Sequence, residues 1–338
     1  MSELRSMLAD TAAKVLGRDG AGWPDIAASG LCNVMVPEAA GGFGGGWEDA
    51  LAVFRQAGLG ALAQPVAETV IGSRILAACG VATGDAPVTF VTQAEGEVSE
   101  STGFTGTLRN VPWDDRAPLI LGRTQMMGEA WLMVLDAASA VSRSTRNNLA
   151  GEPRGTLAYR TATVQLARWP AAEAHNFTQM GALARAGQIA GAMEAMLAMT
   201  IEHAKTRQQF GRAIGNFQAI QQQLAVFASE TAAVGAAAAA AARAADRGDA
   251  SFEIAAAKLR ANRAVDVAAS VAHQVHGAIG ITKEHALHRY TQRLWSWKSD
   301  FGNDRLWADR LGSLAASRGA DNFWADLTRP RTAATAPL

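Results

Sequence analysis

Apolar residues recur at helical spacing over most of the second half of the chain. Ile189, Met193 and Met196 fall on one face of a predicted helix. This helix begins near Asn176, which forms a variant capping box with Gln179. The same spacing predicts further helices at about 217–247, 250–276, 285–298 and 304–317. Because their buried faces are rich in Ala and allow close packing, we expect a compact four-helix bundle.

The first half of the chain shows two different patterns. Short amphipathic stretches at about 7–16, 47–58 and 67–79 predict helices, interrupted by a loop rich in Pro and Gly at 36–46. From about 86 to 170, short β-type runs follow one another at 88–91, 104–108, 119–121, 131–135 and 163–166. Since no long helical pattern separates these runs, they predict a small antiparallel sheet or barrel and argue against a Rossmann unit.

These patterns predict a fold that is mainly α with a small central β-domain. We expect a shortened N-terminal helical domain at 1–85, the β-domain at 86–172, the bundle domain at 173–328 and a disordered tail at 329–338. In the first long helix, Gly187 and Gly191 lie one turn apart and would let another helix approach closely.

Composition limits the kinds of partner. With 31 basic and 31 acidic residues, the formal net charge is zero, so we expect neither nucleic acid nor an anionic membrane surface as a main partner. The Ala-rich run 232–245 is too short and too weakly apolar to predict membrane insertion. The N-terminus lacks an apolar signal core, which indicates a cytoplasmic protein. The spacing of the two cysteines and of the histidines predicts no metal site.

Two connections in the helical half combine residue types that suit an anionic, aromatic cofactor. A guanidinium matches a pyrophosphate, amides match ribose or adenine, an aromatic ring offers an apolar face, and glycine allows close backbone approach. A lone arginine in a loop would be interpreted as solvated, but the combination favours cofactor contact. The candidate residues are Arg207, Gln209, Phe210 and Gln218 in the first connection, and Gln274 and Gly277 in the second.

The order of the parts and both connections resemble the acyl-CoA dehydrogenase family. The resemblance is carried by residues 207–214 with 217–218, by 274–280 and by the helix end at 246–248. It implies that FAD lies between two subunits of a tetramer and that both connections reach the neighbouring subunit's flavin. It further implies α,β-dehydrogenation of an acyl-CoA thioester in acyl-CoA catabolism. In that reaction a carboxylate removes the α proton, the β hydrogen leaves as hydride to flavin N5, and an electron-transfer flavoprotein accepts the electrons.

The chain departs from this family where the catalytic base is expected. The position that matches the usual glutamate is Phe301, and the alternative family position is Gly181. Asp300 is the nearest substitute and our candidate base, with capping of the turn or of the following helix as its other interpretation. In the β-domain, only Thr92 and Trp113 could stand in for the family's flavin-facing residues.

Three functional hypotheses follow from these observations. The chain could be a catalytic FAD-dependent dehydrogenase in a homo- or hetero-tetramer, a non-catalytic subunit that completes the FAD site of a related chain, or a flavin-free acyl-CoA-binding scaffold. An oxidase is a further enzymatic option. Arg185 could meet a CoA phosphate or belong to a buried ion pair. The acyl group stays open among short, branched, aromatic and steroid-derived CoA esters.

Overall fold

The computed structural model describes residues 3–17, 21–99, 101–319, 321–322 and 324–325. Contacts divide the chain into two compact units, with Met1–Phe54 and Leu62–Gly181 in unit 1, and Arg55–Ala61 and Ala182–Leu338 in unit 2. The predicted fold class, mainly α with a small β part, is confirmed. The division into domains at 85, 172 and 328 stays a prediction, and the expected disordered tail at 329–338 lies outside the described residues.

The chain begins with helices. In chain order they are α1 (Glu3–Leu16), α2 (Trp23–Ala28), the 3-10 turns η1 (Leu31–Asn33) and η2 (Glu38–Ala40), α3 (Trp47–Leu59) and α4 (Val66–Ala78). Of these, α1, α3 and α4 agree with the predicted amphipathic stretches. Helix α4 is buried nearly all round. Its Thr69 hydroxyl accepts a hydrogen bond from the Val88 N–H at 3.1 Å, which ties the helix to the first strand.

The rest of unit 1 contains two four-stranded sheets. The first sheet is formed by β1 (Val88–Phe90), β4 (Leu119–Met126), β5 (Glu129–Asp136) and β8 (Val164–Arg168). The second sheet is formed by β2 (Ala94–Ser99), β3 (Gly103–Pro112), β7 (Pro153–Ala162) and β6 (Ser142–Asn147). Each set is given in its order across the sheet, and the 3-10 turn η3 (Ala137–Ser139) follows β5. The β1–β4 pair is parallel, and the other pairs in these sheets are antiparallel.

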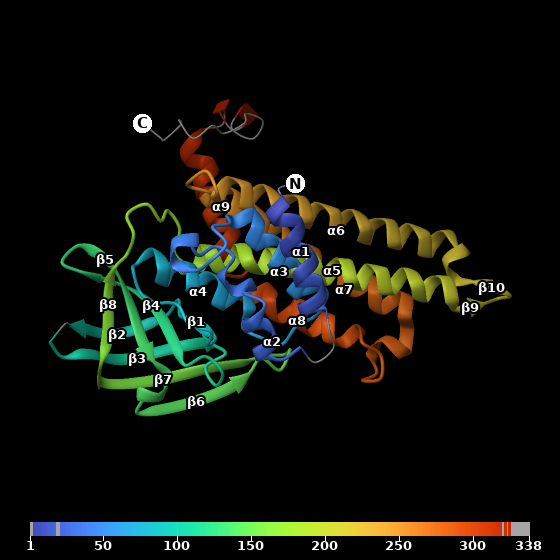
Figure 1. Ribbon diagram of the computed structural model, residues 1–338. Coiled ribbons are helices and arrows are strands. Elements are labelled where there is room, and N and C mark those ends of the chain that lie inside the picture. Colours follow the sequence, from blue (N-terminus) through green and yellow to red (C-terminus); the bar gives the residue numbers. More distant parts are fainter. Residues whose placement is uncertain (1–2, 18–20, 100, 320, 323, 326–338) are drawn as a thin grey trace. The chain divides into compact units, whose positions relative to one another are not determined.

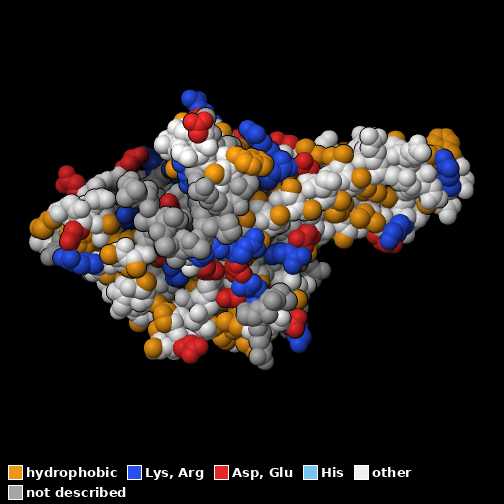
Figure 2. Space-filling view, turned by 90° about the horizontal axis from the view of Figure 1, so that it is seen from above, with side chains coloured by type: hydrophobic (Ala, Val, Ile, Leu, Met, Phe, Trp, Pro, Cys, Tyr) orange, Lys and Arg blue, Asp and Glu red, His pale blue; other side chains and the backbone are white. Residues whose placement is uncertain are grey.

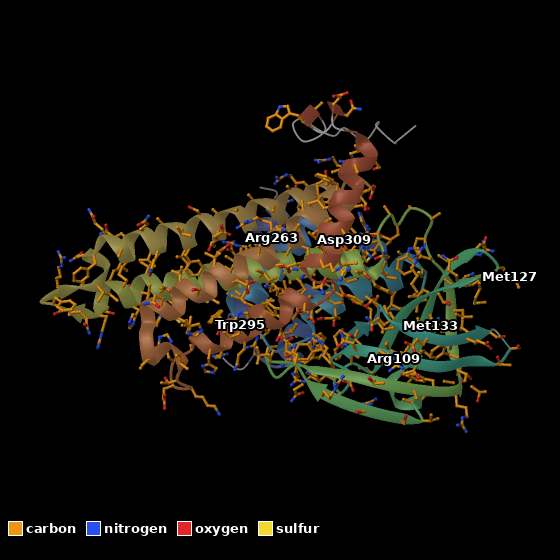
Figure 3. All side chains as sticks on the ribbon, turned by 180° about the vertical axis from the view of Figure 1, so that it is seen from behind. Arg109, Met127, Met133, Arg263, Trp295 and Asp309 are labelled. Carbon is orange, nitrogen blue, oxygen red and sulfur yellow. The ribbon has the colours of Figure 1, made fainter. Side chains whose placement is uncertain are left out.

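The two sheets share one apolar core. Leu108 of β3 lies opposite Leu157 of β7, and both pack in one cluster with Ile120 of β4 and Met133 of β5. Met127, by contrast, is fully exposed at the β4–β5 turn (Figure 3). The five strands that we predicted are present. Strands β2, β6 and β7 were missed, and the side chains of β2 and β6 are mostly polar and exposed, so these two lack an alternating apolar pattern.

Unit 2 consists mainly of long helices. The elements of this half are α5 (Phe177–Thr206), the short strands β9 (Gln208–Gln209) and β10 (Arg212–Ala213), η4 (Ile214–Asn216), α6 (Gln218–Ala245), α7 (Ser251–His276), η5 (Gly277–Ile281), α8 (Leu287–Ser299) and α9 (Asp304–Arg318). The capping box at the start of α5 is confirmed, since Asn176 and Gln179 each donate a backbone N–H to the other's side-chain oxygen at 3.1 Å. Figure 1 shows the β9–β10 hairpin at the far end of the α5–α6 pair.

Helix α6 changes one conclusion drawn from composition. The Ala-rich run 232–245 is only the second part of a 28-residue helix, and this whole helix is long and apolar enough to cross a bilayer by length and composition alone. Core helices of soluble proteins meet the same criterion. Most of the apolar window of α6 is not buried within the chain. The run 232–245 alone is too short to cross a bilayer, but the helix that contains it is not, and much of the apolar surface of this helix is left uncovered within the chain.

Two glycines bring the end of α3 close to α5 within unit 2. A Cβ atom added at Gly191 would lie 1.9 Å from the Arg55 carbonyl oxygen. A Cβ atom added at Gly58 would lie 2.0 Å from the Gln188 carbonyl oxygen. Because backbone atoms cannot move aside cheaply, the helices can approach this closely only with glycine at both positions.

Replacing Gly191 by alanine is expected to lower the free energy of unfolding by about 1–3 kcal/mol, because the new methyl group must push the two helices apart. Gly235 in α6 provides the matched control, since no described heavy atom lies within 4 Å of a Cβ placed there. Gly235→Ala is expected to raise the free energy of unfolding by roughly 0.5–1 kcal/mol. Urea unfolding followed by circular dichroism measures both, and a stabilised Gly191→Ala variant would contradict the close approach.

Candidate functional site

The first candidate connection forms a tight hairpin at the end of α5 and α6. Gln208–Gln209 pairs with Arg212–Ala213, and the residues between them, Phe210 and Gly211, have φ angles of 51° and 76°. Positive φ at both central positions defines a type I′ turn, which is strained for a phenylalanine. The Phe210 ring is 91% exposed. The turn therefore presents an aromatic ring to its surroundings in spite of the strain.

The predicted cofactor residues face away from the core of their own chain. All six are exposed: Arg207, Gln209, Phe210, Gln218, Gln274 and Gly277. The backbone of Arg207 is fixed, since its N–H donates to the His203 carbonyl and its carbonyl accepts from the Ile214 N–H, both at 2.9 Å. Figure 2 shows apolar and basic side chains next to each other at the end of the α5–α6 pair. The hairpin thus presents a guanidinium group and an aromatic ring to its surroundings.

The second candidate connection begins where α7 ends. Gly277 has a φ angle of 64°, and among the described residues no heavy atom lies within 4 Å of a Cβ placed there. Its backbone is therefore open to close approach by a ligand. Gly280, in contrast, is packed, because a Cβ there would lie 2.9 Å from the Cβ of His276. One glycine of this segment is accessible, and the other lets the segment fold against its own helix.

Histidine rings lie between the two connections. His203, one turn before Arg207 on α5, stacks on His276 at the end of α7, with ring centroids 4.5 Å apart. The His285 ring packs against the His276 ring, with ring centroids 4.7 Å apart. The Nδ1 atom of His276 lies 2.8 Å from the Ala272 carbonyl oxygen, which can only accept, so Nδ1 carries the hydrogen. Burial lowers the pKa of His276 to about 4 and also lowers the pKa of His203.

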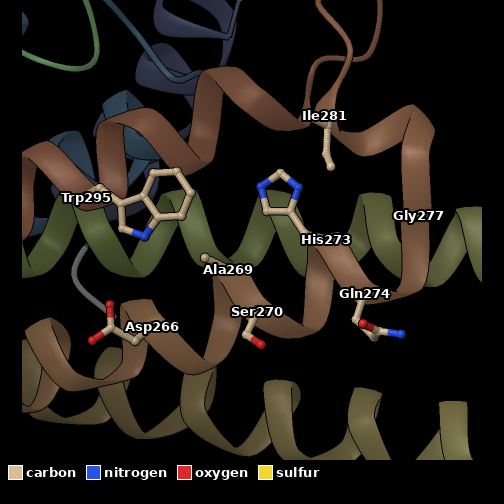
Figure 4. A pocket seen from close by; sticks show the side chains of 8 residues that line it. All are labelled: Asp266, Ala269, Ser270, His273, Gln274, Gly277, Ile281 and Trp295. Atoms are coloured by element: carbon tan, nitrogen blue, oxygen red, sulfur yellow. The ribbon is translucent and has the colours of Figure 1, made fainter.

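A pocket of about 560 Å³ lies beside the second connection (Figure 4). Its walls are formed by α7, η5 and α8 through Asp266, Ala269, Ser270, His273, Gln274, Gly277, Ile281 and Trp295. The His273 ring lies nearly parallel to the Trp295 indole, with centroids 6.2 Å apart, and burial lowers the pKa of this histidine. Because no Lys or Arg is among the described residues that line the pocket, it suits an uncharged planar group better than a phosphate.

Comparisons with known proteins agree with this architecture. Residues 157–296 match the family "Acyl-CoA dehydrogenase, C-terminal domain". The chain is 29% identical over 270 residues to the acyl-CoA dehydrogenase IpdE2 of Mycobacterium tuberculosis, covering 78% of this chain and 76% of that protein. The chain belongs to the acyl-CoA dehydrogenase family.

Two further similarities concern length and fold. The acyl-CoA dehydrogenase FadE34 of M. tuberculosis is 28% identical over 333 residues, which cover 91% of this chain but only 45% of FadE34. This chain therefore spans less than half of that relative. The fold resembles a chain in the crystal structure of the ChsE4–ChsE5 complex from M. tuberculosis, with a TM-score of 0.81 at 22% identity, covering 95% of this chain and 99% of that one.

The positions that correspond to the acyl-CoA dehydrogenase base carry no carboxylate here. Phe301 has a φ angle of 54°, and Gly181 is buried in α5. Asp300, which precedes Phe301, has its Oδ2 atom 3.1 Å from Nε of the buried Arg185. The Arg185 guanidinium also lies 5.3 Å from the centre of the Phe301 ring. Of the two roles considered for Arg185, the structure therefore shows the buried ion pair.

The helix that follows Asp300 has a different residue at its N-cap. That helix, α9, is capped by Asn303, whose side-chain oxygen accepts the Leu306 N–H at 3.1 Å. The Asp300 side chain is 13% exposed and held by its ion pair with Arg185. Asn303 and not Asp300 therefore occupies the N-cap position of α9, and the capping of the turn by Asp300 and its role as catalytic base both stay predictions.

Sequence reasoning missed Lys258 of α7, whose side chain is fully buried next to this ion pair. Its Nζ atom lies 2.6 Å from Asn262 Oδ1 and 3.0–3.2 Å from the carbonyl oxygens of Trp297, Lys298 and Gly302. The ammonium group therefore caps the end of α8 and holds the turn before α9. Burial lowers the pKa of Lys258 to about 7. A lysine on a buried helical face was the only sequence signal for this role.

The two β-domain candidates do not offer comparable groups. Trp113 is buried, with a φ angle of 55°, and the Arg116 guanidinium lies 5.2 Å from its ring centre. Thr92 is exposed in the loop between β1 and β2. Trp113 therefore packs in the core of unit 1, and the flavin-facing role suggested for these residues stays a prediction.

His285 and His288 also make local hydrogen bonds. His285 Nδ1 accepts the Leu287 N–H at 3.2 Å, and His288 Nδ1 lies 2.7 Å from the His285 carbonyl oxygen. Within the described part of the chain, no group of three or more His, Cys, Asp or Glu side chains is arranged to hold a metal ion.

Proposed function

We propose that this chain is a subunit of an oligomeric, FAD-dependent acyl-CoA dehydrogenase and that it completes the FAD site of a neighbouring, base-bearing chain. One observation carries the proposal: the residues suited to bind the cofactor point out of the chain that contains them. Contact with a ligand that a second chain holds would explain why Phe210 is exposed at positive φ and why Arg207 is exposed.

The residues present fit FAD. The Arg207 guanidinium can pair with the pyrophosphate, and the amides of Gln209, Gln218 and Gln274 can bind ribose or adenine. The backbone at Gly277 is open to close approach. FAD bound there would supply the hydride acceptor for α,β-dehydrogenation of an acyl-CoA thioester, with an electron-transfer flavoprotein as the expected electron acceptor.

The missing base supports a division of labour between chains. Phe301 and Gly181 cannot accept the α proton, and Asp300 is held by Arg185. A neighbouring chain would therefore provide the carboxylate, and this chain would provide the hairpin and the α7 end. The apolar surface of α6 that is left uncovered within this chain supports an assembly. The similar ChsE4–ChsE5 structure is itself a complex of two different chains.

A second candidate function is catalysis by this chain itself, with Asp300 as the base. It is favoured by the place of Asp300, one residue before the position that matches the usual glutamate. In this case the Asp300–Arg185 ion pair would have to open before proton transfer, because a carboxylate must reach the proton that it abstracts.

The proposal is tested by purifying the full chain alone and together with a related dehydrogenase chain that carries the base. We expect flavin absorbance and acyl-CoA turnover only in the complex. In the complex, Arg207→Gln is expected to weaken FAD binding by about 10–100-fold, because a charge-assisted hydrogen bond to the pyrophosphate is lost. Arg305→Gln, an exposed arginine of α9, is the control and should leave FAD affinity unchanged. A yellow, active homotetramer of the lone chain would contradict the proposal.

A further inference from the structure

We infer that His203 and His276 are positioning residues: their uncharged, stacked rings fix the direction of the arm, residues 207–217, relative to η5. His203 lies at the base of the arm, where its carbonyl accepts the Arg207 N–H at 2.9 Å. His276 directly precedes Gly277, and its side chain packs against Gly280. The ring contact therefore connects the start of one candidate connection with the start of the other.

The arm beyond its base is exposed, so contacts at the base decide where its tip points. Residues 207–212 are all exposed, and the hairpin is held together by its own β9–β10 pairing. Gly215 is tied to α6 through the Gln221 amide, which donates to its carbonyl at 2.9 Å. The contact of His203 with His276 adds a lateral connection from α5 to the end of α7, at a ring separation of 4.5 Å.

The lowered pKa values of both stacked imidazoles favour their uncharged forms. The groups that act on the pKa values of the two rings are Arg207 at the start of the arm, His273 on α7 and His285 before α8, and each is cationic when protonated. Protonation of both stacked rings would place two positive charges within 4.5 Å of each other beside Arg207. Because the folded pKa of His276 is lowered from 6.5 to about 4, the stack is intact above about pH 6.5 and is weakened as the pH falls towards 4.

The use of this coupling rests on the proposed function. Arg207 and Gln209 lie on the arm, and Gln274 and Gly277 lie at the end of α7. If both segments contact one FAD molecule, their spacing must match that ligand before it binds, since preorganisation reduces the entropy lost on binding. The stack would set this spacing without touching the cofactor.

The coupling is tested by a distance measurement between spin labels at Gln208→Cys and Ile281→Cys, both exposed positions, in the full chain with Cys32 and Cys79 replaced by alanine. An excess of unlabelled chain suppresses distances between chains. At about pH 7.5 we expect one narrow distance distribution, and at about pH 4, where the stacked His276 is protonated, a broadened one. Circular dichroism at each pH separates displacement of the arm from unfolding.

Three substitutions make the test specific. His203→Phe keeps an aromatic ring but cannot be protonated, so its distribution should stay narrow at both pH values. His203→Ala should give a broad distribution at both. His288→Phe changes a histidine outside the stack and should behave like the unsubstituted chain. A narrow distribution for His203→Ala, or acid broadening in His203→Phe, would overturn the inference. Since no cofactor is present in the measurement, this result is independent of whether the proposed function holds.

Discussion

Replacing Lys258 by methionine is expected to lower the free energy of unfolding by roughly 3–5 kcal/mol, although the side chain touches no solvent. The substitution removes the donor for Asn262 Oδ1 and for three carbonyl oxygens at the end of α8 and in the turn before α9. Buried acceptors without donors are costly, and methionine supplies none. For a unit of this size the thermal midpoint should fall by roughly 6–20 °C in a calorimetric scan.

Lys298→Met is the matched control for this variant. Lys298 is a partly exposed lysine in the same region that pairs with the exposed Asp266, so its loss should change the free energy of unfolding by less than about 1 kcal/mol. A Lys258→Met chain that melts like the control would show that the ammonium group does not hold the turn.

The pH dependence of the same pair of proteins gives a second measurement. Burial lowers the pKa of Lys258 from 10.5 to about 7, so between these values the unfolded chain binds a proton that the folded chain does not. The stability of the unsubstituted chain should therefore rise with pH across this interval, relative to Lys258→Met. A difference between the two proteins that does not change with pH would contradict the lowered pKa.

Asp300→Asn is expected to destabilise the chain by about 3–5 kcal/mol while leaving turnover per folded, FAD-loaded complex unchanged. Asparagine keeps the shape of aspartate but leaves the guanidinium of the buried Arg185 without its opposite charge. Acyl-CoA turnover is measured and normalised to bound flavin, and the stability of the same variant is measured by urea unfolding. This pairing separates a structural ion pair from a catalytic base.

A different result would identify Asp300 as the base. Loss of general-base catalysis lowers kcat by about 10²–10⁴-fold, so a folded, FAD-loaded Asp300→Asn complex with such a loss would support catalysis by this chain. Asp309→Asn, an exposed position on α9 that is paired loosely with Arg305, is the control and should change stability by no more than about 0.5 kcal/mol.

Patterns that repeat along the chain could be predicted from the sequence. The start of α5 follows from a local capping box between Asn176 and Gln179, and helix bounds agree with the predicted ranges to within a few residues. Strand β6 could not be found in this way because all its side chains are exposed and polar. Its place is decided by pairing with β7, which is a contact between distant residues.

The candidate site could be predicted only where its residues form short motifs of neighbouring positions in the sequence. The hairpin around Phe210 and the glycines after α7 are short motifs, and their outward placement is a property that the sequence alone does not give. The role of Lys258 depends on backbone carbonyls 39–44 residues further along the chain. Since every residue has a carbonyl, no sequence pattern marks these partners.

The exposed Phe210 ring has a consequence for how stability is reported. Burying such a ring contributes about 1.5–3 kcal/mol, and within the isolated chain this contribution is absent because the ring is 91% exposed. In the assembly that we propose, the contribution would be gained on association, so mass action would make the melting temperature increase with protein concentration. A melting temperature for this protein would then depend on the protein concentration as well as on the fold, and values taken at different concentrations should not be compared directly.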